Sequence, residues 1–301
     1  MKPQIIVICG PTASGKSSLS IKLAKELNTE IISADSLAIY KYLDIGTAKP
    51  TIEEQSIVKH HLIDVVWPTS KFSVSDYERL SLPIVDELIS KGKIPIICGG
   101  TGFYINSILY KMSYGSTNEN LEVRQKYMKM AETDGVDAVY EELRKIDDKA
   151  TLKIHKNDLV RVVRALEIYY STGKRKSDQN DQLTPRYDYL AFMPDFERQK
   201  LYERINRRVD IMMDMGLVNE VKSLIKMGIN KDFQCMQGIG YKETYDAIVS
   251  GDYTGLSDLI KINSRHYAKR QITFFKRLER LTRVSCDNDK ALDQILSTLN
   301  L

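Results

Sequence analysis

A short segment near the N-terminus carries the pattern GxxxxGK[ST], which is typical of loops that bind phosphate groups. Its eight residues are Gly10, Pro11, Thr12, Ala13, Ser14, Gly15, Lys16 and Ser17. A glycine-rich turn of this spacing points successive backbone N–H groups into one concavity, which suits the oxygens of a diphosphate or triphosphate. Lys16 adds a positive charge, and the hydroxyl of Ser17 is a candidate ligand for Mg²⁺. The segment therefore predicts a site for a phosphorylated ligand.

The residues on either side of this loop have the patterns of a strand and a helix. Residues 5–9 form an unbroken apolar run, which predicts a buried strand that enters the loop. Residues 18–27 place Leu19, Leu23 and Leu27 on one side of a helix that leaves it. The positive end of that helix would face the phosphates, as in other phosphate sites at helix N-termini.

Two further predicted strands end in polar residues that could join the same site. Residues 30–34 lead into Asp35 and Ser36, and residues 93–98 lead into a glycine turn that holds Thr101. Because the carboxyl ends of parallel strands meet at one edge of the sheet, we expect Asp35 and Thr101 near the phosphate loop. An alternative interpretation is that the glycines around Thr101 serve only to allow a tight turn.

The distribution of strand and helix patterns predicts an α/β fold with a P-loop NTPase-like parallel sheet and an inserted all-helical lobe. Residues 1–112 form the first part of the core. Residues 113–185 lose strand character and show helical spacing at 121–132, 136–146 and 159–170. Residues 186–301 return to the core, with a strand at 187–193 and a helix at 197–215.

The C-terminal part is strongly basic although the net charge of the chain is only +4. Residues 261–283 hold eight Lys or Arg residues and one acidic residue, Glu279, and we interpret them as one long helix with a cationic face. Such a face favours a polyanionic partner, although solvated basic faces are also common. The loop alone favours a small-molecule or nucleotide kinase, because most proteins with such a loop bind nucleotide triphosphates. A kinase for a small metabolite does not need a long cationic face, whereas an enzyme that acts on a structured nucleic acid does.

Composition places the 301-residue chain among ordinary globular proteins, with 43% hydrophobic and 28% charged residues. Its four cysteines are far apart and make no zinc-binding pattern, which suggests a reducing compartment. No segment approaches the roughly 18 apolar residues of a membrane span. We therefore expect a cytoplasmic protein without a membrane partner.

The motifs, taken in order, resemble those of the bacterial tRNA dimethylallyltransferase family, also called tRNA isopentenyltransferases. The similar stretches are GPTASGKS, ADSLAIYKYLDIGTAKPT, HHLIDV, ICGGTGFYINSILY, RALEIYYSTGK, YERINRRVD with GLVNEV, QGIGYKE and YAKRQITFF. This resemblance implies transfer of a dimethylallyl group from dimethylallyl diphosphate to the exocyclic amine of the adenosine 3′ of the anticodon. It also implies Mg²⁺, a P-loop that holds diphosphate, and the tRNA anticodon stem-loop as partner; we expect a monomer.

The resemblance also assigns roles to particular residues. Asp35 is the implied base at the adenine amine, Thr101 a hydroxyl beside the diphosphate, and Arg208 a cation that stabilises the leaving group. The implied tRNA-binding positions are Asp35, Ser36, Leu37, Ala38, Thr101, Arg124, Val160, Arg161, Arg164, Gln237, Gly238, Ile239, Gly240, Tyr241, Lys242, Lys269, Arg270, Gln271 and Lys276. Those in the segment 113–185 make the helical lobe a tRNA-contacting region.

The chain departs from the family pattern at four positions that bear on tRNA recognition and leave the donor site unchanged. Ala38 and Val160 stand where glutamine is usual, and His266 and Phe275 stand where glutamine and tryptophan are usual. Two alternatives remain from related chemistry or the same loop: prenyl transfer to a free adenine nucleotide, and a P-loop kinase for a small molecule. A non-catalytic RNA-binding protein is a third, against which Lys16 and Asp35 argue.

Overall fold

The computed structural model describes residues 4–112, 120–178 and 184–300, and the chain divides into two compact units. One unit combines Met1–Leu109 with Pro185–Leu301, and the other is Tyr110–Thr184. Within the first unit, the backbone N–H of Arg186 donates a hydrogen bond of 2.7 Å to the carbonyl of Leu109. The chain therefore leaves and rejoins the first unit at adjacent positions.

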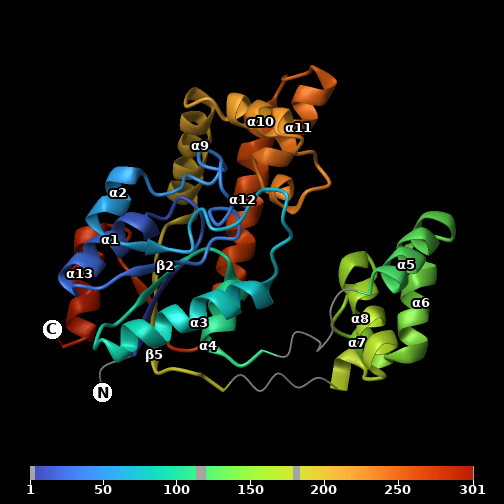
Figure 1. Cartoon of the computed structure of the whole chain (residues 1–301), viewed down its shortest axis with the longest axis horizontal. Coiled ribbons are helices and arrows are strands. Elements are labelled where there is room, and N and C mark those ends of the chain that lie inside the picture. The colour runs from blue at the N-terminus through green and yellow to red at the C-terminus, as the bar shows by residue number, and fades with distance from the viewer. Residues whose placement is uncertain (1–3, 113–119, 179–183, 301) are drawn as a thin grey trace. The chain divides into compact units, whose positions relative to one another are not determined.

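A single six-stranded sheet forms the centre of the first unit (Figure 1). Its strands are β1 (Ile5–Cys9), β2 (Ile31–Ser33), β3 (His60–His61), β4 (Ile96–Gly99), β5 (Tyr189–Pro194) and β6 (Leu281–Val284). They lie in the order β3-β2-β4-β1-β5-β6, and every pair is parallel. Because β1 is apolar throughout and fully buried, it occupies the interior of the sheet, as a central parallel strand must.

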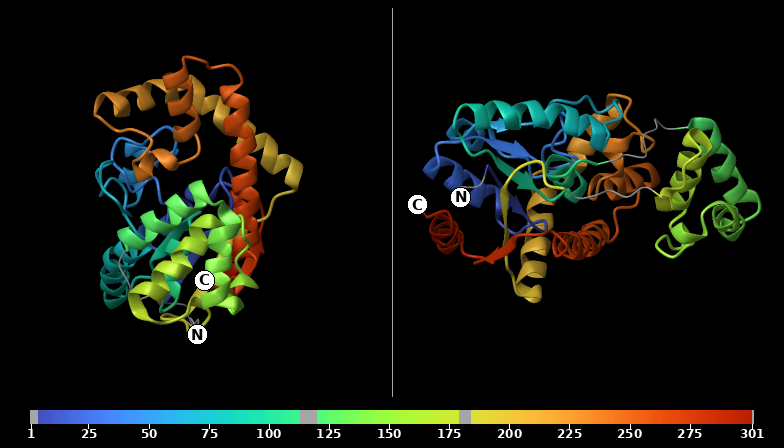
Figure 2. Two further views of the ribbon diagram at one scale, coloured as in Figure 1. Left: turned by 90° about the vertical axis from the view of Figure 1, so that its right-hand side faces the viewer. Right: turned by 90° about the horizontal axis from the view of Figure 1, so that it is seen from below.

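Helices cover the sheet and build the walls above its edge. In the first unit they are α1 (Lys16–Glu26), α2 (Ile52–Ile57), α3 (Val74–Ser90), α4 (Gly102–Leu109), α9 (Arg198–Asp214), α10 (Leu217–Lys226), α11 (Tyr241–Ser250), α12 (Leu256–Phe275) and α13 (Asn288–Thr298), with a 3₁₀ turn at Gln234–Gln237. Leu23 of α1 and Ile295 of α13 are fully buried with Ile6 and Ile8 of β1 in one core cluster. Helices α9 and α12 pack against each other through Leu201, Ile205 and Ala268 (Figure 2).

The second unit is helical in its described residues. It holds α5 (Leu121–Thr133), α6 (Val136–Ile146), α7 (Asp148–Thr151), α8 (Leu159–Thr172) and a 3₁₀ turn at Lys176–Asp178. Its own core buries Tyr127, Leu143 and Leu166 completely or almost completely. The predicted fold class, an α/β parallel sheet with an inserted helical segment, is confirmed.

The predicted long basic helix over 261–283 is wrong at its C-terminal end. Helix α12 stops at Phe275, and the chain turns through Arg280, which has a positive φ of 57°, into strand β6. The reason is that β6 pairs with β5 and buries Val284 in the main core. Arg280 and Arg283 therefore lie outside the helix, and Lys276 is its C-cap residue.

The strand predicted over 5–9 and the helix predicted over 136–146 occur with those bounds, and the other predicted elements occur with small shifts of their ends. Strand β3 covers only His60–His61, because Leu62 and Asp64 have positive φ values of 62° and 57° that extended strands do not allow. Helices α2, α10 and α13 were not predicted.

Candidate active site

The phosphate-binding loop joins β1 to α1, as its flanking patterns predicted. Gly15 has a φ of 78°, a left-handed conformation that glycine adopts without strain, and α1 begins at Lys16 directly after it. Arg204 of α9 donates a hydrogen bond of 2.8 Å to the carbonyl of Ala13 and supports the loop from outside. The positive end of α1 therefore lies at the loop, which favours a bound anion.

Two side chains of the loop, those of Lys16 and Ser14, are suited to a phosphate ligand. The ammonium of Lys16 donates a hydrogen bond of 2.6 Å to the carbonyl of Pro11. Burial, assisted by the charge of Arg208, lowers the pKa of Lys16 from 10.5 to about 8. The hydroxyl oxygen of Ser14 is buried and has no hydrogen-bond partner in the described part of the chain. Such a group normally has a partner, and a phosphate oxygen would supply one.

A cavity of about 440 Å³ opens beside the loop and receives residues from distant parts of the sequence. Its lining includes Thr12, Lys16, Ser17, Asp35, Ser36, Leu37, Ala38, Gly46, Thr47, Lys49, Arg208, Gln237, Gly238, Ile239, Tyr267, Arg270 and Gln271. The structure thus brings Thr12, Lys16 and Ser17 of the phosphate loop together with Arg208 and Asp35, whereas Thr101 is not among the lining residues. The volume is within the usual range for a small-ligand pocket, about 300–1,000 Å³.

Asp35 follows β2 and is held by the backbone of its own turn. Its Oδ1 accepts hydrogen bonds from the N–H groups of Leu37 at 2.9 Å and Ala38 at 3.1 Å. Thr101, predicted to lie beside the diphosphate, accepts a hydrogen bond of 3.0 Å from the N–H of Ser36 and donates one of 3.2 Å to its hydroxyl. Thr101 therefore fixes the turn that carries Asp35 from the neighbouring strand.

Arg208 reaches the cavity from α9 and is half-buried there. Its Nη2 donates a hydrogen bond of 2.9 Å to the carbonyl of Thr47. Burial lowers the pKa of the Arg208 guanidinium, whereas the charge of Asp35 raises it. The charge of Asp35 likewise opposes the lowering of the pKa of Lys16, so both cations respond to this carboxylate. Such a cluster of perturbed groups in a cleft is typical of active sites.

Gln271 connects the two glycine-rich turns, a role that sequence reasoning missed. Its Oε1 accepts a hydrogen bond of 2.9 Å from the N–H of Thr12, and its Nε2 donates one of 3.0 Å to the carbonyl of Gly100. A Cβ atom on Gly100 would lie 2.2 Å from that amide nitrogen, and one on Gly99 would lie 2.1 Å from the carbonyl of Ala34. These glycines have no positive φ, so they serve close packing and not a left-handed turn.

Of the residues predicted to bind tRNA in the first unit, one group lines the cavity described above and another group is basic and exposed. Lys242, Lys269, Arg270 and Lys276 are exposed cations. Lys269 and Lys276 line a second cavity, of about 340 Å³, that also includes Pro11 of the phosphate loop. Tyr241 differs from these cations, because its side chain is fully buried and its hydroxyl donates a hydrogen bond to Glu220.

The basic residues predicted to bind tRNA in the second unit are engaged in ion pairs. Arg124 and Arg164 both pair with Glu167, which is fully buried, at 2.7 Å and 3.0 Å. Arg161 pairs with Asp158 at 3.3 Å, and the nearby Val160 is 74% exposed. Arg124 therefore joins α5 to Glu167 of α8, whereas Arg164 pairs with Glu167 within α8.

Within residues 4–112, 120–178 and 184–300, no three His, Cys, Asp or Glu side chains gather as a set of metal ligands. The adjacent histidines are used otherwise: His60 contacts the carbonyl of Val58 at 2.8 Å, and His61 contacts Glu30 at 2.7 Å. None of the described helices is long and apolar enough to cross a lipid bilayer.

Comparison with known proteins identifies the family of this chain. Residues 38–278 match the family model for IPP transferase. The chain is 43% identical over 300 residues to the tRNA dimethylallyltransferase of Acetivibrio thermocellus, covering 98% of this chain and 96% of the relative. It is 45% identical over 302 residues to the enzyme of the same name from Caldanaerobacter subterraneus subsp. tengcongensis, with the same coverage.

Solved structures agree with this match. The full-length tRNA isopentenylpyrophosphate transferase from Bacillus halodurans is 40% identical and superposes with a TM-score of 0.74, covering 98% of this chain and 95% of the other. A eukaryotic dimethylallyltransferase acting on tRNA is 29% identical, with a TM-score of 0.84, covering 98% of this chain and 78% of the other. The resemblance that the sequence motifs predicted is confirmed, and the chain belongs to the IPP transferase family.

Proposed function

We propose that this protein transfers a dimethylallyl group from dimethylallyl diphosphate to the exocyclic amine of the adenosine 3′ of the anticodon in tRNA. The observation that carries the proposal is the convergence of Lys16, Arg208 and Asp35 on one cavity beside a P-loop. Two cations suit a diphosphate leaving group, and a carboxylate suits the amine that replaces it. The names of the relatives support the same reaction.

The donor diphosphate lies on the phosphate loop in this proposal. Its oxygens accept hydrogen bonds from the loop N–H groups and from Ser14, whose hydroxyl has no other partner in the described chain. Lys16 and Arg208 neutralise the charge that grows on the diphosphate as the C–O bond breaks. The allylic carbon then faces the part of the cavity that Asp35 lines.

The residues at the loop also fit a Mg²⁺ ion. Ser17 lines the cavity and carries a hydroxyl, and Mg²⁺ in phosphate sites takes few protein ligands, with substrate oxygens and water completing its shell. The absence of a larger ligand cluster in the described residues agrees with that arrangement. When bound, the ion would supply further neutralisation of the diphosphate charge.

Asp35 accepts the proton of the amine as the new bond forms. An aromatic exocyclic amine is a weak nucleophile because its lone pair is delocalised into the ring, so removal of its proton assists attack. One C–N bond forms, one C–O bond to the diphosphate breaks, and the amine proton passes to Asp35. The hydrogen bonds from Leu37 and Ala38 hold the carboxylate in place during this exchange.

The acceptor reaches the cavity from the side where exposed basic residues gather. Arg270 both lines the cavity and is exposed, and Lys269 is exposed beside it on α12. Cations of this kind bind RNA phosphates. The adenine leaves the stacked loop to bring its amine into the cavity, as other enzymes that act on a base require. We further propose that the protein acts as a monomer.

Purified protein incubated with labelled dimethylallyl diphosphate tests the proposal. The acceptors offered are total tRNA, an anticodon stem-loop, and AMP; ATP labelled in its γ-phosphate is offered in a parallel reaction. We expect label from the donor in the two RNAs and none in AMP. Label in AMP would indicate a free-nucleotide prenyltransferase, and transfer of the γ-phosphate would indicate a kinase.

A further inference from the structure

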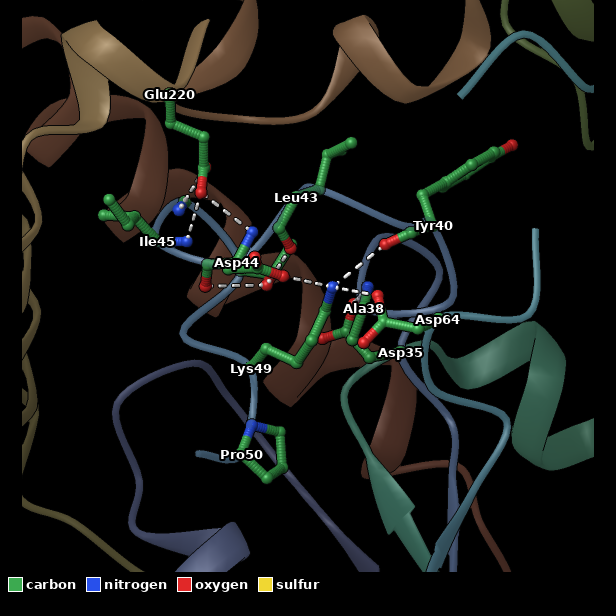
Figure 3. A network of polar contacts seen from close by, with 12 residues as sticks. Asp35, Ala38, Tyr40, Leu43, Asp44, Ile45, Lys49, Pro50, Asp64 and Glu220 are labelled. Carbon is green, nitrogen blue, oxygen red and sulfur yellow. Dashed lines mark hydrogen bonds and ion pairs between the residues drawn. The ribbon is translucent and has the colours of Figure 1, made fainter. Parts of the chain in front are cut away.

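One carboxylate outside the cavity holds a turn that forms part of its wall. Glu220 of α10 accepts hydrogen bonds from three successive backbone N–H groups (Figure 3). Those of Asp44 and Ile45 donate to its Oε2 at 3.0 Å and 2.8 Å, and that of Gly46 donates to its Oε1 at 3.2 Å. Hydrogen bonds to an ionised acceptor are stronger than neutral ones, so this turn is firmly attached to α10.

Tyr241 completes the attachment from a third segment. Its hydroxyl donates a hydrogen bond of 2.7 Å to Oε1 of Glu220. Its ring lies so close to Gly46 that a Cβ atom there would be 2.5 Å from it. The carboxylate of Glu220 therefore accepts four hydrogen bonds, which fills its approximately four acceptor positions. The position of this turn depends on both the charge and the shape of Glu220.

Lys49 anchors the other end of the same segment. Its side chain is 5% exposed, and its ammonium donates to the carbonyl of Tyr40 at 3.0 Å, to Asp44 at 2.5 Å and to Asp64 at 2.6 Å (Figure 3). The segment 44–49 is thus fixed at its beginning by Glu220 and at its end by Lys49.

The carbonyl that contacts Arg208 lies between these two anchors. Thr47 accepts the hydrogen bond of 2.9 Å from Arg208, and residues 46–50 line the cavity. Glu220 is absent from that lining. Any influence of Glu220 on the reaction therefore passes through the segment it holds, and the most direct route is from Gly46 through Thr47 to Arg208.

We propose that Glu220 is a positioning residue for prenyl transfer, which places Arg208 by fixing the segment 44–47. This inference rests on the proposed function, because the role of Arg208 belongs to that reaction. Tyr241 is a second positioning residue in this arrangement. Its hydrogen bond connects Glu220 to the segment 237–240, part of which lines the same cavity.

Glu220→Gln is the sharpest test because it keeps the size of the side chain. The amide retains one acceptor oxygen and turns an NH₂ group toward N–H or O–H donors, so about half of the contacts are lost. We expect kcat for tRNA to fall about 10- to 100-fold, since small misplacements of a catalytic group have effects of that size. The KM for dimethylallyl diphosphate should change less than threefold. Tyr241→Phe removes one hydrogen bond, keeps the ring, and is expected to lower kcat about two- to fivefold.

A double-mutant cycle separates positioning from a general structural role. If Glu220 acts through Arg208, then Glu220→Gln has little further effect on kcat in an Arg208→Ala background. Equal fold losses in both backgrounds would overturn the proposal, as would a wild-type single-turnover rate in Glu220→Gln. The control is Glu203→Gln, an exposed residue on the same helix as Arg208, which should leave kcat unchanged.

The outcomes distinguish this inference from the proposed function. An inactive wild-type protein would contradict the function, whereas an active wild type with an unaffected Glu220→Gln variant would contradict only the inference. If Glu220→Gln does not fold, Tyr241→Phe and its own cycle with Arg208→Ala decide the question. A Tyr241→Phe variant of wild-type rate would then count against the proposal.

Discussion

The ammonium of Lys16 lies 2.6 Å from the carbonyl oxygen of Pro11, within the same phosphate-binding loop. The side chain of Lys16 thus extends back across the phosphate-binding loop to Pro11. Burial lowers its pKa to about 8, so the protonated fraction of Lys16 falls at moderately alkaline pH. Both facts bear on how the loop receives a diphosphate.

The affinity for dimethylallyl diphosphate should therefore decrease as the pH rises through about 8. The anion requires the protonated lysine, so the dissociation constant rises by up to about tenfold per pH unit above that value. Isothermal titration calorimetry between pH 7 and pH 10, roughly spanning this ionisation, measures it. In Lys16→Met the affinity should be weak and this dependence absent, and a persisting slope would assign it to the ligand.

The same ionisation affects the stability of the protein without ligand. The pKa of Lys16 is about 8 in the folded state and 10.5 in a reference peptide, so the unfolded chain binds more protons between these values. The contribution of Lys16 to the free energy of unfolding therefore increases with pH in that window. Urea denaturation of the wild type and of Lys16→Met at several pH values measures it, and parallel pH profiles would contradict the shift.

Asp35→Asn should lower kcat by about 10² or more, in the range of a lost general base. Asparagine can keep the acceptor for Leu37 and Ala38, so the turn is preserved while the basicity is removed. Donor and tRNA affinities should change little. Rapid-quench single-turnover kinetics at saturating substrates measure the chemical step, and a rate near that of the wild type would remove Asp35 from the mechanism.

Neutralising Lys269 and Arg270 together should weaken tRNA binding and reduce its dependence on salt. Both side chains are exposed on α12, and each lost phosphate contact lowers the salt slope by about one unit. Binding measured at four salt concentrations gives the slope. The matched control, Lys222→Gln with Lys226→Gln, removes two exposed charges from α10. An unchanged slope in the Lys269 and Arg270 variant would show that this face is only solvated.

Glu167→Gln should destabilise the helical unit by about 1.5–3 kcal/mol, the range for a hydrogen bond to a charged group, because the substitution removes the charge of this carboxylate. Glu167 is fully buried between Arg124 and Arg164, which are only partly exposed. Hydrogen exchange in the intact chain should show reduced protection of α5 and α8. The control is Glu141→Gln, whose pair with Arg144 is exposed and contributes little. Equal effects of the two substitutions would argue against the importance of burial.

The strand–loop–helix unit around Lys16 could be predicted because all of its information is local. The pattern of apolar residues sets β1 and α1, and the glycine spacing sets the loop between them. The position of Asp35 followed from one general rule, that parallel strands end at the same edge. These sequence patterns predict the local structure independently of contacts with distant parts of the chain.

The roles of Gln271 and Glu220 could not be predicted in the same way. Gln271 and Thr12 are 259 positions apart in the sequence, and Glu220 and Gly46 are 174 positions apart. The local pattern of apolar residues therefore cannot predict either contact. The end of α12 was missed for a related reason. The helical spacing of basic residues continues past Phe275, whereas the pairing of β6 with the distant β5 determines the backbone there.

The hydrogen bond between Arg186 and Leu109 lies where the chain leaves and rejoins the first unit, so the inserted helices could be exchanged there. Since the chain leaves and returns at one junction, a short glycine-rich connection could replace the insert without altering the order of the strands. The remaining protein would keep the phosphate loop, Asp35, Arg208 and the hydrogen bonds of Glu220 to residues 44–46. A helical module of different surface charge could be grafted at the same junction while the six strands keep their order.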